Sequence, residues 1–294
     1  MFTTLVAVIA ALVLGHLSPA VVAVLRDWRW FGRWLAWLQA QGGAASGRYG
    51  LLLALAPLVL PVALLQWLLD GRLYGLPALL FGIAVLVLCW GPRDLDRDVE
   101  AVIDADDAEG RVQALSQLQS AGGSLREDVP SLVDAVVFNA LRRWFAPLFW
   151  FLLLGPFGVL AYRLLAQAVQ GPQAAQMVEA SRAGGAWALR LLEWPVAQLM
   201  TLSMALVGNF DTVFSAWRRA AGNRWVLDLE FLGAAARAGV GMELVEEAEE
   251  ARVAGLVPID ERFPELRDAM SVVWRMLLLW MALLALLIIA GWVG

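Results

Sequence analysis

The sequence predicts an all-α polytopic membrane protein with about six transmembrane helices and two helical cytoplasmic lobes. Of its 294 residues, 61% are hydrophobic and 17% are charged, and the mean hydropathy is +0.68. Soluble domains are about half apolar and about a quarter charged. The apolar residues lie in runs long enough to cross the hydrocarbon core of a bilayer. Most charged residues lie between these runs, which predicts the two lobes.

Residues 1–90 are predicted to hold three transmembrane helices. The first, at 2–25, lacks the basic start and the cleavage site of a signal peptide, so it is interpreted as a span. The second and third are expected at 51–69 and at about 73–90. Between the first two, residues 26–38 carry arginines and tryptophans at helical spacing, which predicts a helix lying in the membrane interface. The expected interface anchors are Trp28, Trp30, Trp34, Trp37, Trp144 and Trp150.

The first lobe is predicted at 91–145, where 11 acids accompany 6 arginines. Apolar residues at helical spacing predict helices over 95–103 and 112–118. A further helix, at 130–145, ends in Arg142 and Arg143. Pro147 follows in the first turn of the next apolar run, where its missing N–H breaks no helical hydrogen bond. This pattern is typical of a helix entering lipid.

Residues 146–207 are predicted to hold two transmembrane helices, of which the second lies at 187–207. Arg190 and Glu193 interrupt that second run and, three residues apart, can pair on one helix face. An interfacial helix is the alternative for this run. The second acidic lobe, 208–271, is expected to contain a helix at 242–255 and a tether at 257–268. The last span is predicted within 272–294.

The distribution of arginine predicts the topology. Of the 22 basic residues, 4 lie in the 26–50 loop, 6 in the first lobe and 7 in the second lobe. Arginine-rich loops stay in the cytoplasm, and six spans place all three segments on that side. The chain is therefore expected to be multi-pass, with both lobes cytoplasmic and the lipid bilayer as a partner.

Composition excludes several functions. The sequence has no lysine, which rules out a Walker A loop, a Schiff-base lysine and a Ser-Lys dyad. Cys89 is its one cysteine, so disulfides and a cysteine-based metal site are excluded. His16, beside Gly15 and Pro19, is better explained by a kinked helix than by a proton relay. The net charge of −5 argues against nucleic acid as a partner, and no metal or cofactor is expected.

Three segments carry a family resemblance. The first combines Asn139, the APLFW run at 146–150, Gly155, Gly158 and the pair Tyr162-Arg163. The second is Arg93-Asp94-Leu95, and the third runs from Leu192-Glu193-Trp194 to Gly208. Together they resemble the CobD/CbiB/AmpE superfamily of bacterial inner-membrane proteins. One branch of that superfamily is an ATP-dependent amide ligase of cobalamin biosynthesis, and the other, AmpE, is linked to β-lactamase induction.

The resemblance to AmpE is the stronger one. The enzyme branch has an acidic element before APLFW where this chain has Leu141, Arg142 and Arg143, and a polar element after Tyr-Arg that is also replaced. Without these acids, Mg–nucleotide has no evident ligands. The resemblance therefore implies a non-enzymatic regulatory or sensory protein of the inner membrane, acting in the response to β-lactams and cell-wall damage with a possible protein partner.

The expected ligand-binding residues are the polar groups at the cytoplasmic mouth of the helices: Arg93, Asp94, Asn139, Arg142 and Arg143. Arginines there can hold an anionic cell-wall metabolite or a nucleotide by charge-assisted hydrogen bonds. The alternative for these arginines is anchorage to phospholipid. Two alternatives also stay open for the function, namely a divergent cobalamin-type ligase and a transporter of small metabolites, which would need broken helices meeting inside the membrane.

Overall fold

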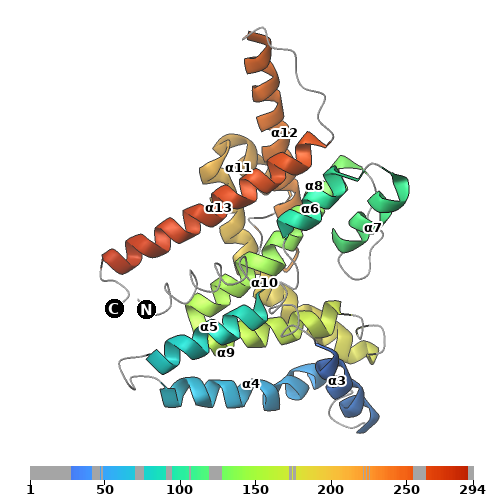
Figure 1. The fold of residues 1–294 in the computed structure, drawn as a ribbon, viewed down its shortest axis with the longest axis vertical. Helices are drawn as coiled ribbons and strands as arrows, with labels where there is room; N and C mark the ends of the chain where they lie inside the picture. Colours follow the sequence, from blue (N-terminus) through green and yellow to red (C-terminus); the bar gives the residue numbers. More distant parts are fainter. Residues whose placement is uncertain are drawn as a thin grey trace. The chain divides into compact units, whose positions relative to one another are not determined.

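The structure is a computed structural model and describes residues 28–41, 47, 49–69, 76–90, 95–105, 107–118, 128–171, 174, 177–220, 222, 224, 226–253 and 263–290. Over these residues it is helical and contains no strand (Figure 1). The helices are α3 (Arg29–Gln41), α4 (Gly50–Leu69), α5 (Leu76–Cys89), α6 (Leu95–Ile103), α7 (Ala108–Leu118), α8 (Val129–Ala140), the π-helix η3 (Leu141–Phe145), α9 (Ala146–Gln170), α10 (Glu179–Val207), α11 (Phe210–Arg219), α12 (Glu230–Val253) and α13 (Pro264–Ile289).

The chain divides into two compact units. Unit 1 comprises Met1–Pro92, Arg142–Glu193 and Leu283–Gly294, and unit 2 comprises Arg93–Leu141 and Trp194–Ala282. Nearly all of both acidic stretches therefore falls in unit 2, although residues 142–193, which separate the two segments of that unit in the sequence, belong to unit 1. Unit 1 holds most of the apolar helices.

In unit 1, α9 packs against both α4 and α5 (Figure 1). The amphipathic helix α3 covers part of α4: Phe31 and Leu35 are buried, and Trp34 Nε1 donates a hydrogen bond to the Ala54 carbonyl oxygen at 3.2 Å. Pro147 occupies the first turn of α9, as its sequence position predicts.

The helix α9 is broken in its middle, at Gly155. This residue has φ 70° and ψ −156°, a backbone conformation available to glycine alone, and Pro156 follows it. The break frees backbone groups that would otherwise bond within the helix. Gln66 of α4 takes up two of them: its Nε2 donates to the Leu154 carbonyl at 3.1 Å, and its Oε1 accepts from the Phe157 N–H at 3.0 Å. The side-chain amide of Gln66 thus satisfies a backbone carbonyl and a backbone N–H that the break in α9 frees.

Replacing Gln66 by leucine should lower the free energy of unfolding by about 2 kcal/mol, because a backbone N–H and a backbone carbonyl within an apolar helix lose their partners. Denaturant titration of the protein in mixed micelles measures this change. The matched control is Gln113→Leu, at an exposed position of α7, which should change stability by less than about 0.5 kcal/mol. Equal effects of the two substitutions would show that the Gln66 bonds are energetically irrelevant.

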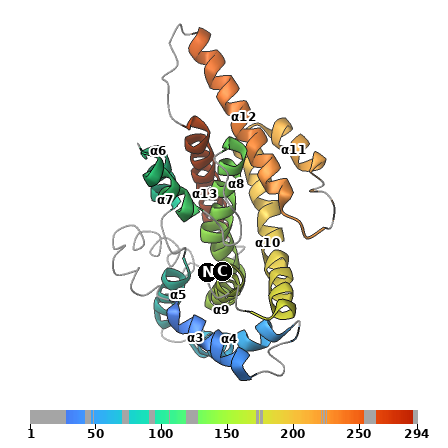
Figure 2. The same ribbon diagram turned by 90° about the vertical axis from the view of Figure 1, so that its right-hand side faces the viewer.

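In unit 2, α12 packs against α11 and α8, and α8 also contacts α6 and α7 (Figure 2). An ion pair joins α12 to α8, between Arg237 and Asp134. Asn139 of α8 donates from Nδ2 to the carbonyl oxygens of Leu118 and Ala135, both at 2.8 Å. The ion pair joins a helix of the first acidic lobe to a helix of the second, and the Asn139 hydrogen bonds join α7 to α8 within the first.

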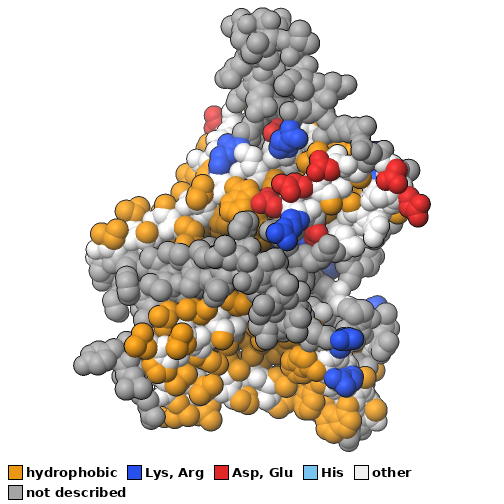
Figure 3. Space-filling model, in the orientation of Figure 1, with side chains coloured by type: hydrophobic (Ala, Val, Ile, Leu, Met, Phe, Trp, Pro, Cys, Tyr) orange, Lys and Arg blue, Asp and Glu red, His pale blue; other side chains and the backbone are white. Residues whose placement is uncertain are grey.

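Among the described residues, three helical stretches are long and apolar enough to cross a membrane: Gly50–Leu69, Val129–Gln170 and Pro264–Leu287. Only 22% of the apolar window of α4 and 28% of that of α13 is buried inside the protein. Hydrophobic side chains accordingly cover the surfaces of α4 and α13, whereas acids gather over α6 and α7 (Figure 3). Exposed apolar helix faces of this length are typical of contact with lipid.

Of the other expected spans, the first stays a prediction, and the helices at the other two positions are not among the candidate spans. The run at 2–25 lies outside the described residues. The helix α5 is apolar but has 14 residues, or about 21 Å at 1.5 Å per residue, which is short of a hydrocarbon core about 30 Å thick. The run at 187–207 belongs to α10, which is not among the candidate spans because Arg190, Glu193 and other polar residues lower its hydropathy.

Two boundaries in the second lobe also differ from the prediction. The acidic helix expected at 242–255 begins much earlier, since α12 starts at Glu230. The expected tether at 257–268 is partly helical, because α13 starts at Pro264 and includes Glu265 in its first turn. A proline at the first helical position starts a helix readily, which explains why this part of the segment is not a loop.

Candidate functional site

Charged side chains of unit 1 meet in the protein interior around Glu193. The π-helix η3 supplies two arginines, α9 supplies a Tyr-Arg pair and α10 supplies the glutamate. Single turns of π-helix occur frequently at functional sites. We call these residues the buried cluster: Arg142, Arg143, Tyr162, Arg163 and Glu193.

The carboxylate of Glu193 is the centre of the buried cluster. Its side chain is 1% exposed, and Oε1 lies 2.9 Å from Arg142 Nε in a salt bridge. Tyr162, which is fully buried, donates its hydroxyl to the same oxygen at 3.4 Å. Charge-assisted bonds of this kind are about twice as strong as neutral ones. They hold η3, α9 and α10 together at one point.

Positive charge exceeds negative charge in the buried cluster, which contains three guanidinium groups and one carboxylate. Arg143 and Arg163 are 8% and 6% exposed. Arg163 lies within electrostatic range of Arg143, Tyr162 and the Cys89 thiol. Within the part of the chain that the structure describes, no group accepts a hydrogen bond from Arg163 Nε. Since buried charges are normally paired, this arrangement can accommodate an anionic group.

The buried cluster contains two of the five predicted ligand-binding residues, Arg142 and Arg143. Asn139 lies in unit 2, is 6% exposed, and uses its side-chain amide to join α7 and α8. Its contacts are those of a structural residue. Arg93 and Asp94 lie outside the described residues. The proposed roles of all five in ligand binding stay predictions.

The sequence interpretation missed Tyr162, Arg163 and Glu193 as members of one site. It expected Glu193 to pair with Arg190, three residues away on the same helix. That pairing is wrong: Arg190 is exposed to solvent, whereas Glu193 points inward and bonds to Arg142. The signal that could have identified these residues is their chemistry, because ionisable side chains within apolar helices are costly and usually functional.

The six predicted anchor tryptophans divide by exposure. Trp30 and Trp37 are 44% and 53% exposed on α3, as interface contact requires. Trp34 is half-buried and stacks on Trp37 with ring centroids 5.3 Å apart. Trp150 is half-buried and donates from Nε1 to the Leu192 carbonyl at 3.3 Å. Trp28 and Trp144 are buried in the protein, so their indoles pack in the core rather than face the bilayer.

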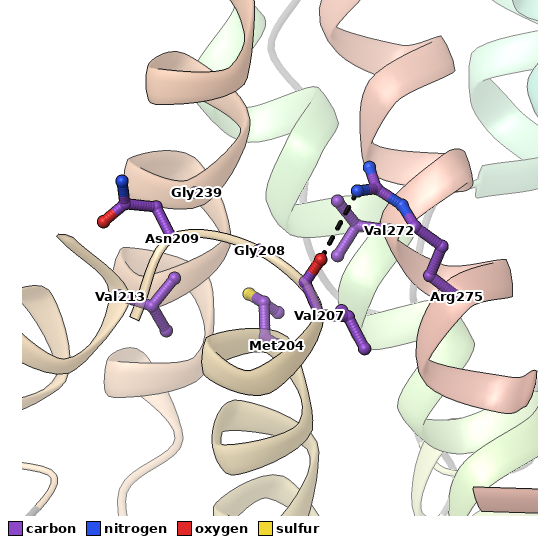
Figure 4. Close-up of a pocket in the computed structure, with 8 residues that line it drawn as sticks. All are labelled: Met204, Val207, Gly208, Asn209, Val213, Gly239, Val272 and Arg275. Atoms are coloured by element: carbon purple, nitrogen blue, oxygen red, sulfur yellow. Dashed lines mark hydrogen bonds between the residues drawn. The ribbon is translucent and has the colours of Figure 1, made fainter. Parts of the chain in front are cut away.

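A cavity of ≈ 300 Å³ lies within unit 2, where α10 ends and α11 begins (Figure 4). Arg275 of α13 reaches towards it and donates to the Val207 carbonyl at 3.5 Å, at the last residue of α10. On the other side, the Asn209 side chain accepts from the Thr212 N–H at 3.1 Å and caps α11. The polar groups around this cavity therefore serve the helix ends, and the buried cluster is the better candidate site.

Comparison with known proteins identifies the family. The family model for the regulatory signalling modulator protein AmpE matches residues 25–243, well over half of the chain and all of the buried cluster. No curated protein and no solved structure matches the sequence. The three candidate membrane helices agree with a membrane-bound member of this family. The chain therefore belongs to the AmpE family of regulatory signalling modulator proteins.

Proposed function

We propose that this AmpE-family protein is a non-enzymatic regulator in the inner membrane that takes part in the response to β-lactams and cell-wall damage. Family membership supports the regulatory role. The apolar helices support the location. In this proposal the acidic stretches gathered in unit 2 face the cytoplasm, where a protein partner in antibiotic-response signalling would contact them.

The observation that carries the proposal is the buried guanidinium group of Arg163, which lies beside the salt bridge of the buried cluster. Arg142 forms a salt bridge with Glu193, and Arg163 is 6% exposed with no hydrogen-bond acceptor for its Nε among the described residues. An anion that binds there gains charge-assisted hydrogen bonds in surroundings that screen charge weakly. The ligand class is an anionic cell-wall metabolite, such as an anhydro-muropeptide, or a nucleotide.

Anchorage to phospholipid explains these arginines less well. Lipid-anchoring arginines extend their heads towards the headgroup layer, so their guanidinium groups stay accessible. Arg163 is 6% exposed and its Nε is enclosed by the protein. The break in α9 gives the transporter alternative little support, since the backbone groups beside Gly155 are already bonded to Gln66.

The test is thermal stabilisation of the full-length protein in detergent by three probes: anhydro-muropeptides, Mg–ATP, and Mg–ATP with cobyric acid. A ligand at 100 times its dissociation constant stabilises the folded protein by about 2.7 kcal/mol, which gives a clear shift in melting temperature. We expect muropeptides to produce this shift in the wild type and in Arg190→Gln, whose side chain is exposed outside the buried cluster. Arg163→Gln should lose it.

The comparison uses the ligand-induced shift of each variant, so a change in its intrinsic stability does not affect the result. Stabilisation by Mg–ATP and cobyric acid together would replace the regulatory proposal with the ligase alternative. A shift that persists in Arg163→Gln would move the ligand away from the buried cluster. No shift with any probe would overturn the proposal that the cluster binds these anions.

A further inference from the structure

The helix α11 has two apolar faces. One face, with Val213 and Ala216, is buried in unit 2. The other carries an aromatic row at the spacing i, i+4, i+7: Phe210, Phe214 and Trp217. The rings of the row stack on one another, with centroids 5.4 Å and 5.2 Å apart, and Phe210 and Phe214 are 48% and 40% exposed. The aromatic row is therefore ordered but open to the surroundings.

The aromatic row continues into an exposed stripe on α10. Leu199, Leu202 and Leu206 lie on one face of that helix and are 40%, 52% and 60% exposed. An apolar groove of ≈ 270 Å³ runs between the stripe and the row, with Leu199, Leu202, Phe214 and Trp217 among its lining residues. We call the leucine stripe, the groove and the aromatic row together the aromatic edge.

The polar atoms at the aromatic edge are turned away from the groove. Trp217 Nε1 donates to Gln198 Oε1 at 2.9 Å, and Gln198 Nε2 donates to the Gly222 carbonyl at 2.8 Å. The N–H of the Trp217 indole is therefore satisfied within the protein, and the residue contributes its apolar ring to the groove. A surface with its polar groups internally bonded and its apolar groups exposed is suited to hydrocarbon.

Positive charge borders this apolar surface. Arg218 and Arg219 form the last turn of α11, Arg224 follows shortly after, and all three are exposed. Arg218 is four residues from Phe214, so the two project from nearly the same face of the helix. Aromatic rings beside exposed arginines on an amphipathic helix are typical of a helix that lies in the headgroup layer of a membrane.

We infer that the aromatic edge lies in the surface of an anionic phospholipid bilayer. Its aromatic row and leucines contact acyl chains, the groove takes part of a lipid chain, and the arginines bind lipid phosphates. The bilayer is favoured as the occupant because the charge is complementary and because the leucine stripe continues along α10, a helix rich in apolar residues. A part of the second acidic lobe that the sequence assigns to water is then held at the membrane.

The experiment measures the depth of spin labels on the full-length protein in nanodiscs that contain phosphatidylglycerol. Cys89, the one cysteine in the sequence, is buried and is replaced by alanine. A nitroxide is attached through Phe214→Cys or, as the matched control, through Ser215→Cys on the neighbouring exposed face. We expect the ratio of collisions with oxygen to collisions with a water-soluble nickel complex to be several-fold higher at position 214.

The headgroup is tested with the Phe214→Cys label in nanodiscs of phosphatidylcholine alone and in an Arg218→Gln/Arg219→Gln background. Each arginine near an anionic surface should raise the ratio of inserted to water-exposed label about fivefold. The double substitution should therefore remove most of the difference between the two lipids, since of the three exposed arginines Arg224 alone remains.

Three results would overturn the inference. Equal accessibility of both positions to the nickel complex would place the aromatic edge in water. Protection of position 214 from both reagents would mean that protein, such as a second copy of the chain, covers it. If the label at position 214 lies equally deep in both lipids and the double substitution does not change that depth, the aromatic edge does not recognise anionic lipid.

Discussion

Replacing Glu193 by glutamine is expected to lower the free energy of unfolding by about 3 kcal/mol. The substitution keeps the size of the side chain but removes the carboxylate charge from the salt bridge that Arg142 makes with the buried Glu193. The loss of one partner of a buried ion pair costs more than the pair contributes, because the remaining charge stays desolvated. Denaturant titration in mixed micelles measures the change.

Two controls separate this effect from a general loss of charge. Glu179→Gln removes the acid of an exposed pair with Arg182, whose side chains are 76% and 47% exposed, and should cost less than about 1 kcal/mol. Arg142→Gln combined with Glu193→Gln should recover part of the stability lost in Glu193→Gln alone, since it removes both charges of the pair. If Glu193→Gln were no more harmful than Glu179→Gln, the buried cluster would not hold the helices together.

Replacing Gly155 by alanine should destabilise the protein by roughly 2–4 kcal/mol, the sum of backbone strain and overpacking. The conformation at φ 70° and ψ −156° is strained for any residue with a Cβ. The added Cβ would also lie 2.7 Å from Gln66 Nε2, the atom that bonds to the Leu154 carbonyl. Alanine at position 155 therefore strains the backbone at the break in α9 and crowds the Gln66 amide that bonds there.

Gly241→Ala is the matched control for this prediction. Gly241 lies within α12, and a Cβ added there meets no atom within 4 Å. Because alanine favours helix over glycine, this substitution should raise stability by up to about 1 kcal/mol. The same chemical change is thus expected to have opposite signs at two positions. A neutral or stabilising effect of Gly155→Ala would mean that α9 can become a regular helix.

The sequence by itself determined most of the helices and the family. Helices over 95–103 and 112–118 and the proline at the start of α9 follow from residues three or four apart, so local spacing was sufficient to place them. The apolar runs of α4, α9 and α13 were recognisable from hydropathy alone. The motifs around residues 139–162 led to the AmpE family, which the family match confirms.

The composition of the candidate site was decided by tertiary structure. Arg142 and Glu193 are 51 residues apart, and Gln66 and Leu154 are 88 apart. Glu193 had a nearer candidate partner in Arg190, and only the packing of η3, α9 and α10 shows that the acid turns inward. The aromatic row of α11 has helical spacing in the sequence, but which of its apolar faces is buried depends on contacts with other helices. Spacing along the chain constrains neighbours on one helix, whereas partners on different helices are set by how those helices pack.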